Sequence, residues 1–203
     1  MMSDLFSDTK ECLQLDLQDA EIILYPHFFG ATEADHYFER LIKELDWSQQ
    51  RITVYGKQHD VPRLSAWYAD DGKTYEYSGL RSVGLPWVPV LTELKKSLLN
   101  VTDQAFNSVL ANLYRNGADS VGWHADDEPE LGREPVIASF SFGEERRFQL
   151  KHKTIKSLRH SVILPHGSLL IMKGATQANW LHQIPKSSRP MRERVNLTFR
   201  QVK

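Results

Sequence analysis

The residues best suited to chemistry in this sequence are His124 and Asp126, which are separated by a single alanine. Imidazole and carboxylate are both common metal ligands. On an extended strand, the side chains at positions i and i+2 project from the same face. A strand or strand end at this place would therefore direct an imidazole and a carboxylate to one point. The spacing predicts a metal site that still lacks a ligand.

The third ligand must come from elsewhere in the chain. Two histidines and one carboxylate form the facial triad of non-haem Fe(II) oxygenases, which leaves coordination positions open for substrate and oxygen. The chain holds eight histidines. His182 lies between two strand-like segments, so it could return beside His124 in a folded sheet. Spacing alone leaves the choice among the histidines open.

The C-terminal segment Arg194–Arg200 alternates polar and apolar residues, as a strand with one apolar face does. Its polar face carries Arg194, Asn196, Thr198 and Arg200. An arginine buried without an anion is costly, whereas guanidinium pairs well with carboxylate. Turned inward, this face fits a dicarboxylate such as 2-oxoglutarate, whose keto-acid end can chelate iron. An equally acceptable alternative places the face in solvent.

In order along the chain, these motifs resemble the AlkB family of Fe(II)- and 2-oxoglutarate-dependent nucleic-acid dealkylating dioxygenases, and most of all its animal DNA-repair members. The resemblance runs from about Val54 to the end of the chain. It rests on Asn112-x-Tyr114, His124-x-Asp126, the distal His182 and the strand Arg194–Arg200. The resemblance implies iron ligation by His124, Asp126 and His182.

The resemblance also implies roles for the residues around the metal. Arg194 would pair with the distal carboxylate of 2-oxoglutarate, and Arg200 would lie near the iron-side carboxylate and Asp126. Asp127 and Glu128 match acidic positions beside the target base, although by themselves they could be loop acids that solvate a turn. Further polar contacts to the cosubstrate would come from Asn112, Tyr114, Asn196 and Thr198.

The segment from about 47 to 80 corresponds to the family's nucleotide-recognition lid. A tyrosine pair in it would contact or stack on the extruded base, although an aromatic strand more often packs in a core. A hairpin finger in it would enter duplex DNA where the flipped base has left. The strand residues are Tyr75, Glu76 and Tyr77, and the finger residues are Val54, Tyr55, Gly56 and Lys57.

The activity implied by the resemblance is oxidative demethylation of N-alkylated bases such as 1-methyladenine and 3-methylcytosine in DNA. The reaction uses iron, consumes 2-oxoglutarate and O2, and releases formaldehyde, succinate and CO2. A damaged pair costs less to open, which aids selection. The alternatives are the same chemistry on RNA or another substrate, a non-catalytic nucleic-acid-binding module, and a structural zinc site, although such zinc sites favour four ligands and cysteine.

The elements that must position these residues follow from periodicity. Apolar residues at helical spacing predict one helix after Thr32, with Thr32 and Asp35 as a capping pair, and a second over 87–99 with Pro89 in its first turn. Short strands are predicted over 108–115, 136–142, 147–151, 160–164, 168–173 and 194–200. The pattern indicates a β-sandwich or jelly roll with flanking helices. Together with the resemblance, it implies an α+β fold: a double-stranded β-helix, or jelly roll, with flanking N-terminal helices and the nucleotide-recognition lid.

Length and composition are consistent with one dioxygenase domain over residues 1–203. Within it we expect a loose arm over 1–20 and a jelly-roll core over about 107–203. The net charge of −1 excludes a molecule-wide attraction to nucleic acid, and charge alone favours a solvated face for the basic segment 146–160. A single cysteine and the lack of a membrane span or signal peptide predict a protein of the cytoplasm, or of the nucleus in a eukaryote. The absence of an apolar helix or strand to spare predicts a monomer.

Overall fold

The computed structural model describes residues 11–54, 56–70, 74–77 and 80–203, with the backbone alone at 53, 54, 74–77 and 80–83. Its helices are α1 (Ala31–Glu44), α2 (Pro89–Ser97) and α3 (Thr176–Asn179), with 3-10 turns η1 (Leu98–Asn100) and η2 (Pro129–Leu131). No helix in these ranges is long and apolar enough to cross a membrane. The strands are β1 (Leu13–Leu15), β2 (Glu21–Tyr25), β3 (Ser48–Val54), β4 (Lys57–Ala69), β5 (Thr74–Tyr77), β6 (Leu80–Val83), β7 (Ser108–Tyr114), β8 (Val121–His124), β9 (Ile137–Gly143), β10 (Arg146–His152), β11 (Arg159–Leu164), β12 (Ser168–Lys173), β13 (Trp180–Ile184) and β14 (Arg194–Arg200).

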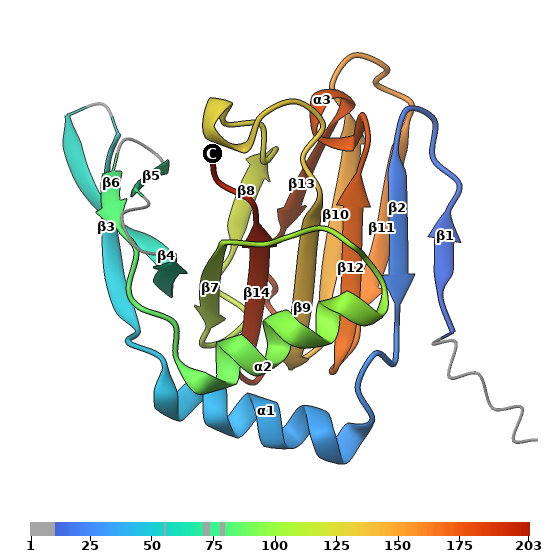
Figure 1. Ribbon diagram of the computed structural model, residues 1–203. Helices are drawn as coiled ribbons and strands as arrows, with labels where there is room; N and C mark the ends of the chain where they lie inside the picture. The colour runs from blue at the N-terminus through green and yellow to red at the C-terminus, as the bar shows by residue number, and fades with distance from the viewer. Residues whose placement is uncertain (1–10, 55, 71–73, 78–79) are drawn as a thin grey trace, which may run out of the picture.

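Two antiparallel sheets face each other, and the site lies between them (Figure 1). The large sheet has the order β1-β2-β12-β9-β14-β7-β4-β3, and the small sheet has the order β11-β10-β13-β8. A separate hairpin pairs β5 with β6. In both sheets several neighbours come from distant parts of the sequence, such as β14 between β9 and β7, and β13 between β10 and β8, which is the arrangement of the predicted jelly roll. The predicted fold class is therefore confirmed.

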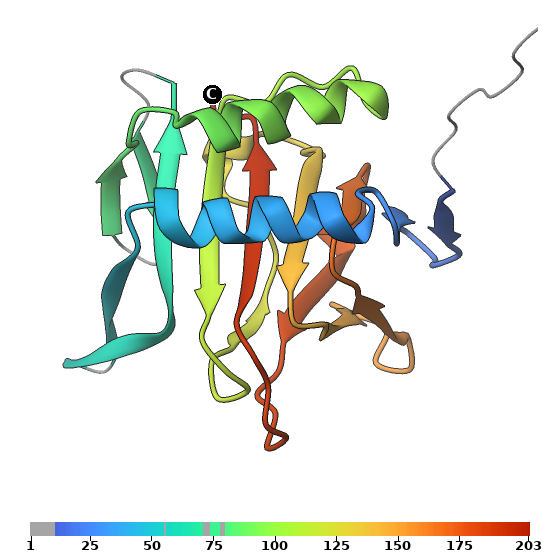
Figure 2. The same ribbon diagram turned by 90° about the horizontal axis from the view of Figure 1, so that it is seen from below.

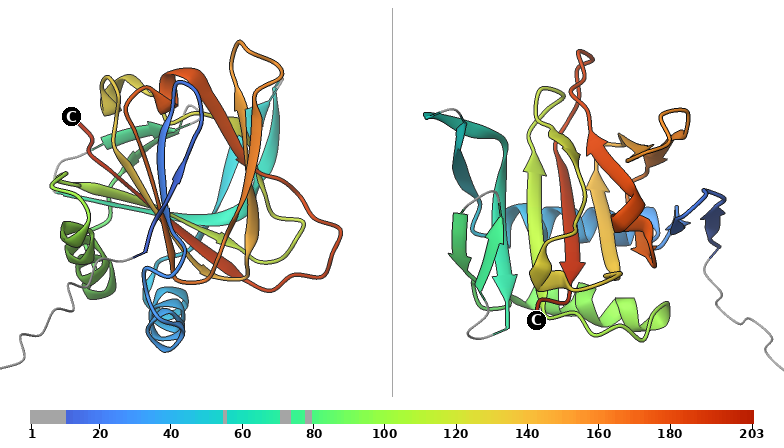
Figure 3. Two further views of the ribbon diagram at one scale, coloured as in Figure 1. Left: turned by 90° about the vertical axis from the view of Figure 1, so that its right-hand side faces the viewer. Right: turned by 90° about the horizontal axis from the view of Figure 1, so that it is seen from above.

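Helices α1 and α2 cover the outer face of the large sheet, opposite the small sheet (Figures 2 and 3). Leu41 of α1 and the α2 residues Leu91 and Leu94 are fully buried against it. Pro89 begins α2, as predicted. The predicted capping pair at Thr32 is wrong, because α1 begins after Gly30, which makes no side-chain capping hydrogen bond.

Strand β14 separates two environments inside the molecule. Val195, Leu197 and Phe199 belong to the apolar cluster shared with the helices. The alternate residues of the strand line the cavity between the sheets. Every residue of β14 is buried, so the alternative that placed its polar face in solvent is wrong.

The large sheet extends beyond the segment 107–203. Strand β2 pairs with β12 on one side, and β4 pairs with β7 on the other. Part of the expected loose arm is the short strand β1, whose Leu13 pairs with Leu24. Helical structure is also not confined to the front half, because the single turn α3 leads into β13.

Candidate active site

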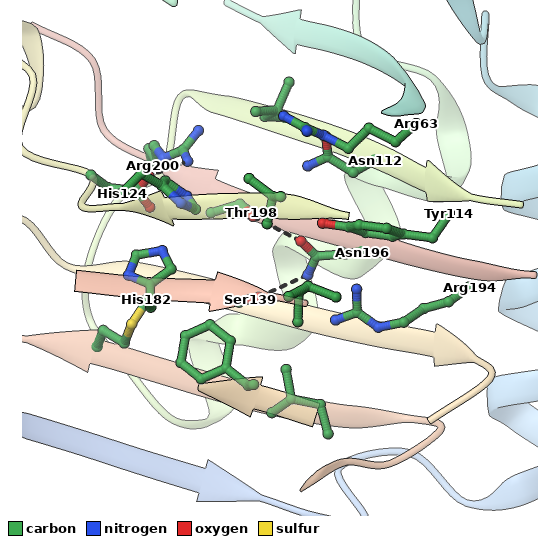
Figure 4. A pocket seen from close by; sticks show the side chains of 17 residues that line it. Arg63, Asn112, Tyr114, His124, Ser139, His182, Arg194, Asn196, Thr198 and Arg200 are labelled. Atoms are coloured by element: carbon green, nitrogen blue, oxygen red, sulfur yellow. Dashed lines mark hydrogen bonds and ion pairs between the residues drawn. The ribbon is translucent and has the colours of Figure 1, made fainter. Parts of the chain in front are cut away.

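Three side chains converge where β8 ends beside β13. The ligand atoms of His124, Asp126 and His182 all lie within 4.8 Å of one another. His124 is the last residue of β8 and pairs with His182 of β13, and Figure 4 shows both imidazoles at the same end of the cavity. Asp126 lies beyond the strand in the following loop. The expectation of a strand end is therefore the one that fits, and a continuous strand through Asp126 is not formed.

Both histidines can present a ring nitrogen to a metal ion. Nδ1 of His124 donates a hydrogen bond of 2.8 Å to the carbonyl of Gly122, which leaves Nε2 free to bind a metal. Burial lowers the pKa of His182 to about 3, and the nearby His124 adds to this effect. Since a ligating imidazole must be deprotonated at one nitrogen, His182 is ready to bind at neutral pH.

The carboxylate of Asp126 is ionised although it is almost fully buried. Burial would raise the pKa of Asp126, but Arg200, His182 and His124 together outweigh this and the pKa is lowered. Nη2 of Arg200 donates a 2.8 Å hydrogen bond to Oδ1 of Asp126. Two imidazoles and one carboxylate are the donor set that suits Fe(II) with open positions.

Arg194 is a buried cation that lacks an anion among the described residues. The residue is 1% exposed, and its Nη2 donates to Oγ of Ser141 at 2.9 Å. Its Nε and Nη1 have no hydrogen-bond partner in the described part of the chain. Burial lowers the pKa of Arg194 to about 10, so it remains charged at neutral pH. A buried guanidinium with free N–H groups fits a carboxylate ligand.

Asn112 and Tyr114 of β7 line the same cavity, as expected. Nε of Arg63 donates a 2.7 Å hydrogen bond to Oδ1 of Asn112. The side-chain amide nitrogen of Asn112 therefore remains to donate a hydrogen bond to a ligand. The ring of Tyr114 lies beside Arg194, with 5.1 Å between its centroid and Cζ.

Asn196 and Thr198 also line the cavity, but their donors are already used. Nδ2 of Asn196 donates to Oγ of Ser139 and to the carbonyl of Phe140, both at 2.8 Å. Oγ1 of Thr198 donates to Oδ1 of Asn196 at 3.3 Å. In this arrangement the pair holds the cavity wall in place and offers acceptors rather than donors to a ligand.

Arg63 and Gln177 are among the polar residues at the site that were not predicted. Arg63 of β4 lines the cavity and is buried. Gln177 of α3 accepts a hydrogen bond from the backbone of Asp126. In the sequence, Arg63 lies among aromatic strand residues, and Gln177 lies in a stretch without periodicity, so neither gives a signal by itself.

The two acids after Asp126 lie at the edge of this constellation. Asp127 is exposed, and its carboxylate accepts a 2.9 Å hydrogen bond from Nζ of Lys153. Glu128 is half-buried, and its Oε2 has no hydrogen-bond partner among the described residues. Neither residue belongs to the lining of the cavity, so their contact with a base stays a prediction.

The predicted lid residues are described only in part. Gly56 lies in the turn between β3 and β4 with a φ of 75°, which favours glycine, and Lys57 is exposed. Val54 ends β3. Tyr55 lies outside the described residues. The backbone of β5 is a strand over Tyr75, Glu76 and Tyr77, and the base contacts of these side chains remain predictions.

The basic segment is divided between interior and surface. Arg146 is 2% exposed and donates to the carbonyl oxygens of Asn116, Asp119 and Pro185. Arg146 is therefore buried, contrary to the solvated face that was expected for the whole segment. The exposed cations of the segment are Arg147, Lys153, Lys156 and Arg159.

Comparison with known proteins agrees with this geometry. The sequence pattern of the 2OG-Fe(II) oxygenase superfamily matches residues 21–200. The chain is 44% identical over 192 residues to the human "Alpha-ketoglutarate-dependent dioxygenase alkB homolog 3", covering 90% of this chain and 66% of that protein. It is 43% identical over 188 residues to the human "DNA oxidative demethylase ALKBH2", covering 88% of this chain and 72% of that protein.

A plant relative and a solved structure extend the comparison. The "DNA oxidative demethylase ALKBH2" of Arabidopsis thaliana is 35% identical over 209 residues, which cover 90% of this chain and 67% of that protein. A structure described as "The structure of OsALKBH1" superposes with a TM-score of 0.67 at 16% identity, covering 94% of this chain and all of that one. At that identity the structural likeness concerns the fold alone. The chain spans just under two thirds of the alkB homolog 3 relatives.

Proposed function

The chain belongs to the 2OG-Fe(II) oxygenase superfamily and, within it, to the AlkB family, and from this we propose that it removes N-linked methyl groups from nucleic-acid bases. The proposed substrates are 1-methyladenine and 3-methylcytosine in DNA. The proposal rests on one observation: a single cavity is lined by His124, Asp126 and His182 and by Arg194, a buried guanidinium without an anion among the described residues. The names of the ALKBH2 relatives favour DNA over RNA.

The residues present fit Fe(II) and 2-oxoglutarate. His124, Asp126 and His182 would hold the iron, and Arg194 would hold the distal carboxylate of the cosubstrate. When bound, iron and 2-oxoglutarate supply the oxidation: O2 is consumed, 2-oxoglutarate leaves as succinate and CO2, and the N-methyl carbon is hydroxylated and then lost as formaldehyde. Such chemistry belongs to the cofactors, and the chain supplies binding, orientation and electrostatics.

The chain orients these groups by burial and by hydrogen bonds. Arg200 fixes one oxygen of Asp126. The ring of Phe148 stacks on His182 at 5.2 Å between centroids and covers it from water. Asp127 and Glu128 lie in the loop that follows the metal site, where their charge would favour the cationic methylated base.

The test uses the protein prepared without oxygen and loaded with Fe(II). An oligonucleotide that contains 1-methyladenine, single-stranded or paired, is incubated with 2-oxoglutarate and air and followed by mass. We expect the loss of one methyl mass, dependent on iron and 2-oxoglutarate and abolished in His182→Ala. Succinate formation with an untouched oligonucleotide would leave an oxygenase and overturn the substrate. Faster reaction of the same lesion in RNA would move the assignment to RNA.

We propose further that the chain acts as a monomer. In its support, the exposed large apolar residues of the described chain belong to separate elements and loops: Leu13, Leu99, Ile155 and Ile163. Light scattering after gel filtration is expected to give the mass of one chain, and twice that mass would contradict the proposal.

A further inference from the structure

We propose that Gln177 positions Asp126, and with it the carboxylate arm of the metal site; the inference rests on the proposed function of that site. Gln177 lies in α3 and is 1% exposed. Its Oε1 accepts a 3.0 Å hydrogen bond from the backbone N–H of Asp126. The two residues are 51 positions apart. The bond therefore joins the loop after β8 to the segment that leads into β13.

Asp126 needs such a partner because the strand pairing has already ended there. The last pair at this end of β8 and β13 joins His124 to His182, and the register is irregular between His182 and Ile184. No neighbouring strand accepts the N–H of Asp126 in the described pairing. A buried amide without an acceptor costs about 1–3 kcal/mol. The side chain of Gln177 takes the place of the missing ladder carbonyl.

Helix α3 can serve as a fixed reference because it is anchored at both ends. Oγ1 of Thr176 donates to the carbonyl of Lys173 at 2.6 Å and accepts from the N–H of Glu21 at 2.9 Å. At the other end, the carbonyl of Asn179 accepts a 2.7 Å hydrogen bond from the N–H of Lys153. The next residues form β13, which carries an imidazole ligand. The short helix thus relates both arms of the metal site to β2, β10 and β12.

The amide of Gln177 is also fixed in orientation. Its Nε2 lies 3.5 Å from Sδ of Met172, a weak acceptor that lines the cavity. This contact leaves Oε1 directed at the loop. A second connection supports the first, because Nζ of Lys153 donates both to the carbonyl of Gln177 at 2.8 Å and to Oδ2 of Asp127 at 2.9 Å. Two successive loop residues are thereby fastened to the same residue of α3.

The expected consequence is on metal affinity. Groups that orient metal ligands typically change affinity or activity about 10- to 100-fold when they are replaced. Gln177→Met keeps the size of the side chain and removes the acceptor, whereas Gln177→Glu keeps an acceptor oxygen. Gln183→Met is the matched control, since Gln183 follows His182 and bonds to Gln149 on β10, away from Asp126.

The experiment measures the dissociation constant of Mn(II) by the electron paramagnetic resonance of the free ion, without 2-oxoglutarate or nucleic acid. Gln177→Met is expected to raise this constant about tenfold or more. Gln177→Glu and Gln183→Met are expected to stay within about threefold of the parent protein, because both leave Asp126 with its acceptor. An unchanged constant in Gln177→Met, or an equal loss in Gln183→Met, would overturn the proposal.

A second measurement covers the case in which Gln177→Met does not fold. Hydrogen exchange of the Asp126 amide in the metal-free parent protein is expected to be slow, and exchange at the rate of an open amide would overturn the proposal. Mn(II) binding does not depend on demethylation. A weakened site in Gln177→Met, together with an oligonucleotide that no variant demethylates, would reject the proposed substrate and leave the positioning role standing.

Discussion

At the scale of single residues, we expect Arg194 to favour ligand binding and to lower the stability of the fold. Its guanidinium is buried, charged and only partly hydrogen-bonded among the described residues. A buried charge without a partner destabilises a protein, and apolar replacement of buried ionic groups is often neutral or stabilising. Its presence is explained by a ligand that brings the missing anion.

This explanation predicts opposite effects of Arg194→Met on stability and on binding. Without ligands, the variant should unfold at the same or a higher temperature than the parent. Its affinity for 2-oxoglutarate should fall about 100-fold, since loss of a buried charged partner costs about 2–5 kcal/mol. Thermal unfolding and calorimetric titration with Mn(II) present measure the two effects. Arg194→Lys keeps the charge but not the planar guanidinium, so its affinity for 2-oxoglutarate should lie between those of the parent and of Arg194→Met. An Arg194→Met protein that is less stable than the parent and binds 2-oxoglutarate equally tightly would contradict the explanation.

At the scale of elements, the loop from β7 to β8 leads into the strand that ends at His124. Asp119 organises this loop by accepting from N, Nε and Nη2 of Arg115 at 2.8 to 2.9 Å. Burial would raise the pKa of Asp119, but the hydrogen bonds from Arg115 outweigh it and the pKa is lowered. The folded state therefore favours the ionised carboxylate.

Asp119→Asn should consequently destabilise the protein by about 1–3 kcal/mol at pH 7, the cost of a lost charged hydrogen bond. A lowered pKa contributes stability that is present above the unfolded value of about 3.9 and is lost as the pH falls through the folded value. The difference between parent and variant should therefore shrink below about pH 4. Urea unfolding at several pH values measures it. A difference that is independent of pH would assign the effect to packing instead.

The two long helices permit a comparison of apolar packing with charge pairing. Arg40 of α1 donates to both carboxylate oxygens of Glu93 in α2, at 2.6 and 3.1 Å. The next residue, Leu94, is fully buried. Leu94→Ala should cost about 2–5 kcal/mol, and Glu93→Gln no more than about 1 kcal/mol because its carboxylate is exposed. Chemical unfolding at low and high salt distinguishes the two contributions, because only the effect of Glu93→Gln should depend on salt.

The elements that the sequence predicted are those with a repeating apolar pattern. Helix α2 and strand β14 follow from the regular spacing of their apolar residues, although β14 is buried on both faces. Strand β1 is too short to show alternation, and α3 is a single turn. At the site, His124 and Asp126 are close in sequence and were predicted. Gln177 depends on a partner 51 residues away, which local pattern cannot reveal.

At the scale of the whole molecule, we expect the protein to fold without the metal. One apolar cluster joins the helices to the large sheet, and the other lies between the sheets. Neither cluster includes a metal-binding residue. A chelator should therefore leave the circular dichroism of the protein intact at room temperature, unlike a domain whose fold depends on a structural metal. Unfolding on chelation would contradict this separation of fold and site.

Ligands should nevertheless stabilise the molecule, because we expect Mn(II) and 2-oxoglutarate to bind the folded chain and not the unfolded one. At 100 times its dissociation constant a ligand adds about 2.7 kcal/mol, which for a chain of this size corresponds to a rise of about 5–10 °C. Mn(II) should raise the unfolding temperature first, and 2-oxoglutarate should raise it further. Arg194→Met should keep the first rise and lose the second, since its change touches only the anion site. If His182→Ala retained both rises, the ligands would be bound elsewhere and the proposed site would be wrong.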